Sequence, residues 1–155
     1  MTPQETFIAT LAPLAQASAA RTRIPASFCV AEAALESGWG TSMLATEAHN
    51  LFGVKADPSW HGPTWALRTR EVVNGQYVVV PANWRSYPDW ASALSDHALF
   101  LMNNPRYAHA FDCTDGEAFA HAVAAAGYST EPDYADRLIS TMRARNLKAL
   151  DVVST

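Results

Sequence analysis

The sequence predicts a mainly helical α+β domain that carries one β-hairpin near its middle. Apolar residues recur at helical spacing before residue 50 and after residue 88. Between them lies a stretch rich in β-branched residues, and Asn74-Gly75 within it is the strongest short-range signal for a hairpin turn. The chain shows no internal repeat and no low-complexity linker, so we expect a single domain over residues 1–150 and a tail over residues 151–155.

The composition is that of an ordinary globular protein. With 155 residues, 49% of them hydrophobic and 17% charged, the chain is able to bury a core without disulfides or metals. The formal net charge of −4 argues against a general binder of nucleic acid or of anionic membranes, which would carry a basic patch. No run of about 18 apolar residues occurs, so we expect no membrane insertion.

Neither the N-terminus nor the cysteines indicate a secreted protein. Residues 1–5 are acidic where a signal peptide is basic, and Pro13 interrupts the apolar run that follows. Cys29 and Cys113 occur without a CxxC motif, so no disulfide framework is expected. We therefore expect synthesis in the cytoplasm without a signal peptide, and delivery by another route if the target lies outside the cell.

Helices dominate the first third of the chain. Thr2 and Glu5 form a capping box for a helix over residues 3–20. A second helix is expected to begin at Pro25 and to end at Gly38, because glycine commonly terminates a helix in the left-handed conformation. The other elements expected before the hairpin are a short helix and a structured loop, over residues 41–48 and 50–55.

The middle of the chain predicts β-structure. β-Branched residues on both sides of Asn74-Gly75 predict two strands joined by a two-residue turn, and in that register Glu71 faces Val78. Residues 84–87 are expected to add a third strand. The rest of the chain is again helical. Its expected helices are a long one after Pro88, a short one over residues 106–111, one that Thr114 and Glu117 cap and Gly127 ends, and a last one that buries Tyr134.

Glu36 is the clearest candidate for chemistry. It falls in the last turn of its helix, where the negative end of the macrodipole disfavours a carboxylate. Glu32 lies on the same face and adds like-charge repulsion, while Leu35 and Trp39 offer an apolar wall. Each effect raises the pKa of a carboxyl group, as a general acid requires. The alternative is an exposed surface glutamate before a glycine cap.

Glu71 and Tyr128 are candidates for the same site. Glu71 lies next to the hairpin turn, and a hairpin that projects from a helical domain forms one wall of a cleft. Glycosidases use two carboxyl groups across the scissile bond, or one group with help from the substrate. Tyr128 follows the helix-ending Gly127, where it is placed to reach into a pocket as a donor. The alternatives are a solvent-facing strand residue for Glu71 and core packing for Tyr128.

The histidines do not predict a metal site. His49, His61, His97, His109 and His121 show no HExxH spacing and no clustering with cysteine. No glycine-rich phosphate loop occurs either, so we expect neither a metal nor a cofactor. His97, on one face of its helix, is interpreted as a structural histidine.

Several blocks of sequence together resemble one known family. They are AALESGWG (33–40), NLFGVK (50–55), TRE (69–71), RSY (85–87), DHA (96–98), RYA (106–108) and AGYSTEPDYA (126–135). In this order they are similar to the bacterial and phage glucosaminidases, glycoside hydrolase family 73, including the wall-cutting domain of flagellar rod-assembly peptidoglycan hydrolases. The resemblance runs from about residue 24 to residue 147.

The resemblance implies a lysozyme-like fold, with a cleft between a helical lobe and a small β-hairpin lobe. It implies cleavage of the β-1,4 bond between N-acetylglucosamine and N-acetylmuramic acid in peptidoglycan glycan strands, by an enzyme acting on the cell wall. A monomer is our default expectation. Glu36 matches the general acid, Glu71 its proposed partner, and Tyr128 a tyrosine that positions the N-acetyl group. The residues of the matching blocks that we expect to bind the substrate are Trp39, Asn50, Phe52, Tyr87 and Tyr134.

Two positions depart from the family pattern, and two other functions stay open. Glu32 stands where relatives often have glutamine, which bears on the acidity of Glu36, and Glu131 stands where aspartate is usual. A phage endolysin or a secreted antibacterial protein would suit a wall hydrolase without a signal peptide. The alternatives are a lytic transglycosylase, which closes an anhydro ring without water, and an inactive glycan-binding domain. The joint presence of Glu36, Glu71 and Tyr128 argues against the inactive domain.

Overall fold

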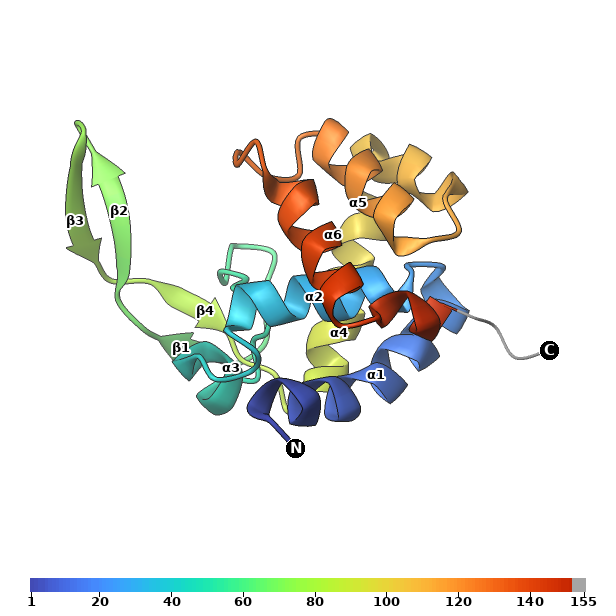
Figure 1. Cartoon of the computed structure of the whole chain (residues 1–155). Helices are drawn as coiled ribbons and strands as arrows, with labels where there is room; N and C mark the ends of the chain where they lie inside the picture. Colours follow the sequence, from blue (N-terminus) through green and yellow to red (C-terminus); the bar gives the residue numbers. More distant parts are fainter. Residues whose placement is uncertain (152–155) are drawn as a thin grey trace.

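The computed structural model describes residues 1–151, which form a helical body from which a β-hairpin projects (Figure 1). Its helices, with η for a 3-10 helix, are α1 (Pro3–Thr22), α2 (Ala26–Ser37), α3 (Met43–Glu47), α4 (Trp90–Asn103), η1 (Pro105–Asp112), α5 (Gly116–Ala125), α6 (Tyr134–Ala144) and η2 (Leu147–Asp151). None of the helices described here has the length and apolar character needed to cross a bilayer. The predicted mainly helical α+β class is confirmed.

Helix α2 lies in the middle of the helical body, with α1, α5, α6 and η2 packed against it (Figure 1). Val30, Ala31, Ala33 and Ala34 point in different directions around α2, and all four are fully buried. A helix that is buried all round belongs to the core, and small alanine side chains allow its neighbours to approach closely. The last turn of α2 is therefore held by packing on several sides.

The helix ends follow the predicted signals, with one exception. The N–H of Glu5 donates to Thr2 Oγ1 at 3.1 Å and the N–H of Thr2 donates to the Glu5 carboxylate at 2.8 Å, so the capping box of α1 is present. Helix α2 ends at Gly38, whose φ of 57° is left-handed. The prediction that Thr114 caps α5 is wrong, because Asp115, a stronger acceptor, occupies the cap position instead.

The strands form two small antiparallel sheets. They are β1 (Thr64–Ala66), β2 (Thr69–Val73), β3 (Gln76–Val80) and β4 (Asn83–Arg85). Strands β2 and β3 form the predicted hairpin, with Glu71 opposite Val78. The predicted strand at residues 84–87 is present as β4, but it pairs with β1 in a separate sheet and does not extend the hairpin. Pro81 directly follows β3 and has no N–H to donate, so the ladder of the hairpin ends there.

One buried side chain holds the loop that follows α3. Asn50 is 1% exposed. Its amide donates to the carbonyls of Val54 and Arg85, both at 2.9 Å, and accepts from the N–H of Val54 at 3.0 Å. Because these bonds use the oxygen and both hydrogens of the amide, Asn50 has no donor left for a ligand. The expectation that Asn50 binds the substrate is therefore wrong: it joins the loop to β4.

The predicted start of the C-terminal tail is also wrong. Asp151 ends η2, and its carboxylate accepts from the N–H of Ser27 at 2.9 Å and from the N–H of Gly116 at 3.3 Å. Asp151 therefore joins the N-terminal ends of α2 and α5 and belongs to the folded domain. Residues 152–155, the remainder of that predicted tail, lie outside the described residues.

We predict that Asn50→Ala lowers the free energy of unfolding by about 1–3 kcal/mol, because buried backbone groups of Val54 and Arg85 lose their partner. Urea denaturation measures the change. Asn83→Ala is the matched control, since Asn83 is exposed in the neighbouring strand β4. Equal stability of the two variants would contradict the role given to Asn50.

Candidate active site

Glu36 lies in the last turn of α2, where the chain leaves the helix. Gly38 and Gly40 have positive φ angles of 57° and 78°. A Cβ atom at Gly40 would come within 2.8 Å of Phe7 and 2.9 Å of Trp90, so only glycine fits this turn without displacing aromatic rings. Because α2 must end here, no further helical turn covers Glu36, and its side chain stays accessible.

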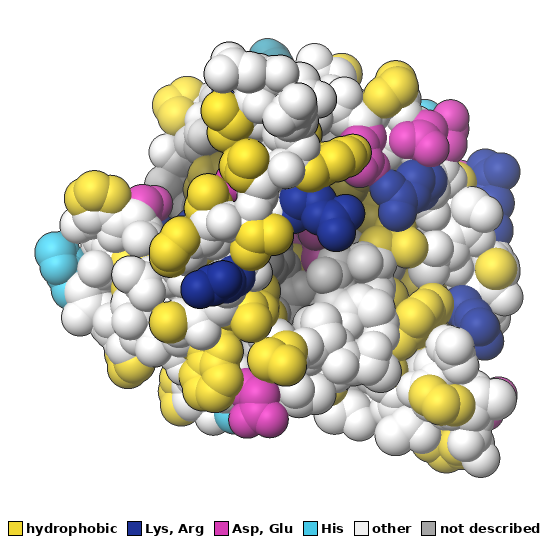
Figure 2. Space-filling model, turned by 90° about the vertical axis from the view of Figure 1, so that its left-hand side faces the viewer, with side chains coloured by type: hydrophobic (Ala, Val, Ile, Leu, Met, Phe, Trp, Pro, Cys, Tyr) yellow, Lys and Arg dark blue, Asp and Glu magenta, His cyan; other side chains and the backbone are white. Residues whose placement is uncertain are grey.

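Glu36 lines a pocket of about 410 Å³. Figure 2 shows the side of the molecule from which the hairpin projects, which is hollowed near its centre, with Lys and Arg side chains beside the hollow. The aromatic residues that line the pocket are Phe52, Phe100, Tyr128 and Tyr134, and the charged ones besides Glu36 are Lys55, Asp57, Arg85 and Asp96. A smaller hollow of about 150 Å³, lined in part by Glu131 and Arg137, also contains Glu36. Glu36 thus lies where two hollows meet.

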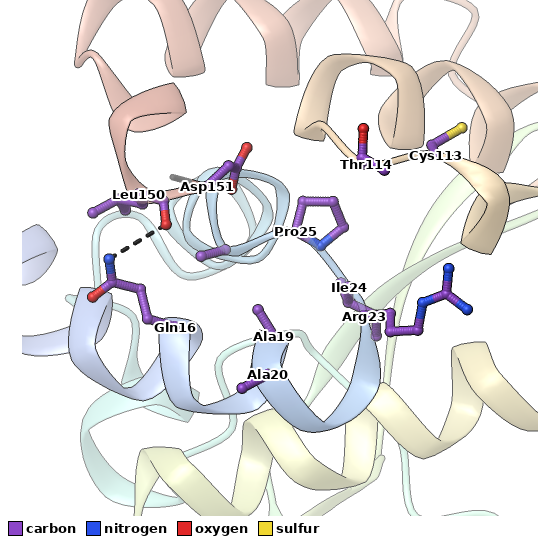
Figure 3. Close-up of a pocket in the computed structure, with 11 residues that line it drawn as sticks. Gln16, Ala19, Ala20, Arg23, Ile24, Pro25, Cys113, Thr114, Leu150 and Asp151 are labelled. Carbon is purple, nitrogen blue, oxygen red and sulfur yellow. Dashed lines mark hydrogen bonds between the residues drawn. The ribbon is translucent and has the colours of Figure 1, made fainter. Parts of the chain in front are cut away.

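A larger hollow, of about 540 Å³, lies away from Glu36 between α1, the start of α2 and η2 (Figure 3). The acid among its lining residues is Asp151, whose carboxylate is already bonded to Ser27 and Gly116. Gln16 donates to the carbonyl of Leu150 at 3.3 Å on its wall. This hollow therefore offers no free acid, and the pocket at Glu36 is the better candidate despite its smaller volume.

The surroundings of Glu36 favour the protonated carboxyl. Withdrawal from solvent is the main cause of its raised pKa, and the charges of Glu32 and Glu131 raise it further. His97 and Arg137 act in the opposite direction without cancelling these effects. The predicted like-charge effect of Glu32 is confirmed.

Glu32, one turn before Glu36 in α2, is fully buried at the centre of a hydrogen-bond network. His97 Nε2 donates to Glu32 Oε1 at 2.7 Å, and the Tyr134 hydroxyl donates to Oε2 at 2.6 Å. Burial alone would raise the pKa of Glu32. The charge and hydrogen bond of His97, with the hydroxyls of Tyr128 and Tyr134, outweigh burial and lower that pKa. Glu32 therefore stays ionised beside Glu36.

Tyr128 and Tyr134 place their hydroxyls in the wall of the pocket. The Tyr128 hydroxyl lies 3.0 Å from His97 Nε2, and the centroids of the two tyrosine rings are 5.5 Å apart. Burial, followed by the charge of Glu32, raises the pKa of both hydroxyls, so both remain neutral donors. The structure therefore brings Glu36, Tyr128 and Tyr134 together in one pocket.

Phe52 and Tyr87 occupy different places. Phe52 lines the pocket and stacks on the ring of His97, with centroids 4.1 Å apart. Tyr87 is buried, and its hydroxyl donates to Asp96 at 2.5 Å. Asp96 in turn accepts from Arg85 at 2.8 Å and lines the pocket. Tyr87 thus supports Asp96. We expected Tyr87 to bind the substrate, but it is not among the residues that line the pocket.

Trp39 lies outside both hollows that contain Glu36. Its φ of 59° belongs to the left-handed turn that ends α2, which directs the side chain toward α1. Its ring packs edge-on against Phe7 with centroids 6.0 Å apart, and the guanidinium of Arg145 lies 5.2 Å from its centroid. Trp39 therefore does not line the hollows at Glu36, and its expected contact with substrate stays a prediction.

Glu71 is not among the residues that line the pocket. Its carboxylate accepts from Lys55 Nζ at 2.7 Å, and the two side chains are 41% and 54% exposed. Lys55 lines the pocket, whereas the hairpin that carries Glu71 projects from the helical body (Figure 1). The structure therefore links Glu71 to the rim of the pocket through Lys55 and does not bring it together with Glu36.

Sequence reasoning missed the charged part of the pocket. Arg85 donates to Asp96 and also to Asp57, at 3.2 Å, and these residues lie in separate segments. Arg85 and Asp96 occur in the blocks that carried the family resemblance, which was the available signal. His97 is buried and hydrogen-bonded, as a structural histidine should be, yet it also lines the pocket. Within residues 1–151, no group of three or more His, Cys, Asp or Glu side chains is placed to hold a metal ion.

The arrangement suits proton donation to a bound ligand. Glu36 carries a raised pKa and remains accessible from the pocket, which are the properties of a general acid. Glu32, one turn away, is ionised and inaccessible, so it contributes charge and hydrogen bonds but does not touch a ligand. The surroundings of two carboxyl groups on one helix thus shift their pKa values in opposite directions.

Known proteins match this chain over most of its length. Residues 12–147 match the glucosaminidase family model, described as mannosyl-glycoprotein endo-beta-N-acetylglucosaminidase. The peptidoglycan hydrolase FlgJ of Vibrio cholerae is 39% identical over 140 residues, which cover 88% of this chain and 42% of that protein. The exo-glucosaminidase LytG of Bacillus subtilis is 34% identical, over 97% of this chain and 55% of that protein. The chain thus spans about half the length, or less, of these curated relatives.

Solved structures share the fold. The catalytic domain of the autolysin Auto from Listeria monocytogenes matches with a TM-score of 0.89 at 28% identity, over 97% of this chain and 88% of that one. A C-terminally truncated glycoside hydrolase domain of FlgJ from Salmonella typhimurium matches with a TM-score of 0.81 at 37% identity, over 92% of this chain and 97% of that one. The predicted lysozyme-like fold is confirmed, and the chain belongs to the glucosaminidase family of glycoside hydrolases, glycoside hydrolase family 73.

Proposed function

We propose that the chain is a peptidoglycan hydrolase that cleaves the β-1,4 bond between N-acetylglucosamine and N-acetylmuramic acid. The observation that carries this proposal is Glu36, an accessible carboxyl with a raised pKa where two hollows meet, in a chain of the glucosaminidase family. The aromatic rings of Phe52 and Phe100 in the lining suit the apolar faces of sugar rings. The relatives named as peptidoglycan hydrolases support this polymer as the substrate.

The place of action follows from the same proposal, and a monomer remains our default expectation. Peptidoglycan lies in the cell wall, so the enzyme acts there, after phage lysis or dedicated secretion. Such an activity would suit a phage endolysin or a secreted antibacterial protein.

In the proposed reaction, Glu36 is the general acid. Its carboxyl donates a proton to the glycosidic oxygen while the bond from that oxygen to C1 of the N-acetylglucosamine breaks, and the muramic acid leaves as an alcohol. Water then adds to C1, and the proton that the water loses returns to the Glu36 carboxylate. The products are a new reducing N-acetylglucosamine end and the regenerated acid.

Two groups are candidates for stabilising the positive charge that develops at C1. One is the carboxylate of Glu71, which is bonded to Lys55 and lies outside the pocket lining. The other is the acetamide oxygen of the substrate itself, which a hydroxyl donor in the pocket would position. The neutral hydroxyl of Tyr128 is such a donor, so we favour attack by the acetamide.

We predict that Glu36→Gln lowers the rate of glycan cleavage by about 10²- to 10⁴-fold, because the amide has no acidic proton to donate. Purified peptidoglycan is digested and the new chain ends are identified by reduction and mass spectrometry. Glu117→Gln, which removes a carboxylate bonded to Arg143, is the control and should keep full activity.

Three results would overturn this assignment. Full activity of Glu36→Gln with an intact fold would exclude Glu36 as the acid. Anhydromuramic acid ends would show a lytic transglycosylase, and reducing N-acetylmuramic acid ends would show cleavage of the other glycosidic bond. Circular dichroism of each variant separates loss of chemistry from loss of fold.

We predict that Glu71→Gln costs less activity than Glu36→Gln, because Glu71 lies outside the pocket lining and is half-exposed. The same digestion measures both variants. Lys55→Gln is the companion variant, since it breaks the same ion pair from the other side. A loss in Glu71→Gln as large as that in Glu36→Gln would instead support a scheme with two carboxylates.

The pH dependence follows from the raised pKa of Glu36. A general acid works only while protonated, so activity is present below this pKa and falls as the pH rises through it. We therefore predict that the alkaline limb of the kcat/KM profile lies above the ordinary titration range of a glutamate. A limb within that ordinary range, measured on solubilised glycan strands, would contradict the assignment.

A further inference from the structure

A buried carboxylate holds the wall of the pocket from behind. Glu32 is 0% exposed, and each of its oxygens accepts a hydrogen bond, one from His97 and one from Tyr134. Withdrawing a carboxylate from water is strongly unfavourable unless it is paired and fully hydrogen-bonded. The positions of these partners are therefore strongly constrained by Glu32.

The partners of Glu32 come from segments far apart in the sequence. His97 lies in α4, Tyr134 begins α6, and Tyr128, in the turn after α5, reaches the network through His97 Nε2 at 3.0 Å. All three line the same pocket as Glu36, and Phe52 packs on the ring of His97. One carboxylate thus connects several parts of the pocket wall to α2, the helix that carries Glu36.

We propose that Glu32 and His97 form a single positioning unit, in which the buried carboxylate holds His97, Tyr128 and Tyr134 in place around Glu36. This proposal rests on the proposed function, because it gives the unit a role in the glycosidase reaction. Because Glu32 is fully buried, it cannot touch the substrate. It acts through the residues that donate to it and is therefore a positioning residue. The unit sets the geometry in which the Tyr128 hydroxyl meets the substrate acetamide.

Glutamine separates this role from simple packing. Glu32→Gln keeps the shape of the side chain but replaces one accepting oxygen with an NH₂ group, which cannot accept from His97 or Tyr134. If Glu32 only filled space, the substitution would be neutral. If the carboxylate holds its partners, the substitution displaces the hydroxyls of Tyr128 and Tyr134. The rate of glycan cleavage then falls, while much of the contact with the substrate remains.

The test is a double-mutant cycle with Glu32→Gln, His97→Gln and the combined variant. Residues that act as one unit show losses that do not multiply. We expect each single variant to lower kcat on solubilised glycan strands by about 10- to 100-fold with a much smaller change in KM. We expect the combined variant to be little worse than the more impaired single variant.

The control cycle uses Glu117→Gln and Arg143→Gln, which break the ion pair between α5 and α6 at 2.6 Å. These residues do not line the pocket, so kcat should be unchanged in this cycle. Midpoints of urea unfolding are measured for both cycles. They report whether Glu32 and His97 are coupled in the folded protein independently of any activity.

The outcomes distinguish this proposal from the proposed function. Multiplied losses in kcat and independent shifts of the unfolding midpoints would overturn the positioning unit. An unchanged kcat in Glu32→Gln would overturn it as well. If the native protein cleaves no glycan, the proposed function fails. The unit itself is then decided by the unfolding cycle and by NMR signals of the Tyr128 and Tyr134 rings, which Glu32→Gln should displace.

Discussion

The burial of one ionised carboxylate is the constraint on which the site depends. Glu32 has no contact with water, so every hydrogen bond it accepts must come from the protein. His97 and Tyr134 supply those bonds, and Tyr128 joins through His97. These residues lie in α4, α6 and the turn before α6. The hydrogen bonds to Glu32 therefore also hold together the side chains of the pocket wall that faces Glu36.

The same constraint accounts for the electrostatics of the pocket. Glu32 and Glu36 lie one turn apart in α2, yet their surroundings favour opposite protonation states. Glu32 stays charged because His97 and the tyrosine hydroxyls outweigh its burial. Glu36 has no such partners. Its partial burial and the charge of Glu32 raise its pKa, so its proton is retained to higher pH. A glycine turn after α2 then leaves the Glu36 carboxyl open to the pocket.

Local signals were sufficient for much of the fold and for the raised pKa of Glu36. The capping box at Thr2, the helix end at Gly38 and the hairpin register at Asn74-Gly75 depend on neighbouring residues, which the sequence displays directly. Partners far apart in the chain could not be predicted. The pairing of β4 with β1 and the amide bonds of Asn50 are set by tertiary packing. So is the bond between Glu32 and His97, residues 65 positions apart.

The central claim is that the charge of buried Glu32 adds to partial burial in raising the pKa of Glu36. The most direct measurement is an NMR titration of the Glu36 side-chain carboxyl, in the native protein and in Glu32→Gln. The account predicts that Glu36 titrates above the ordinary range of a glutamate in the native protein. It also predicts that the midpoint moves down toward that range when the Glu32 charge is removed. An ordinary midpoint in the native protein, or the same midpoint in both proteins, would contradict it.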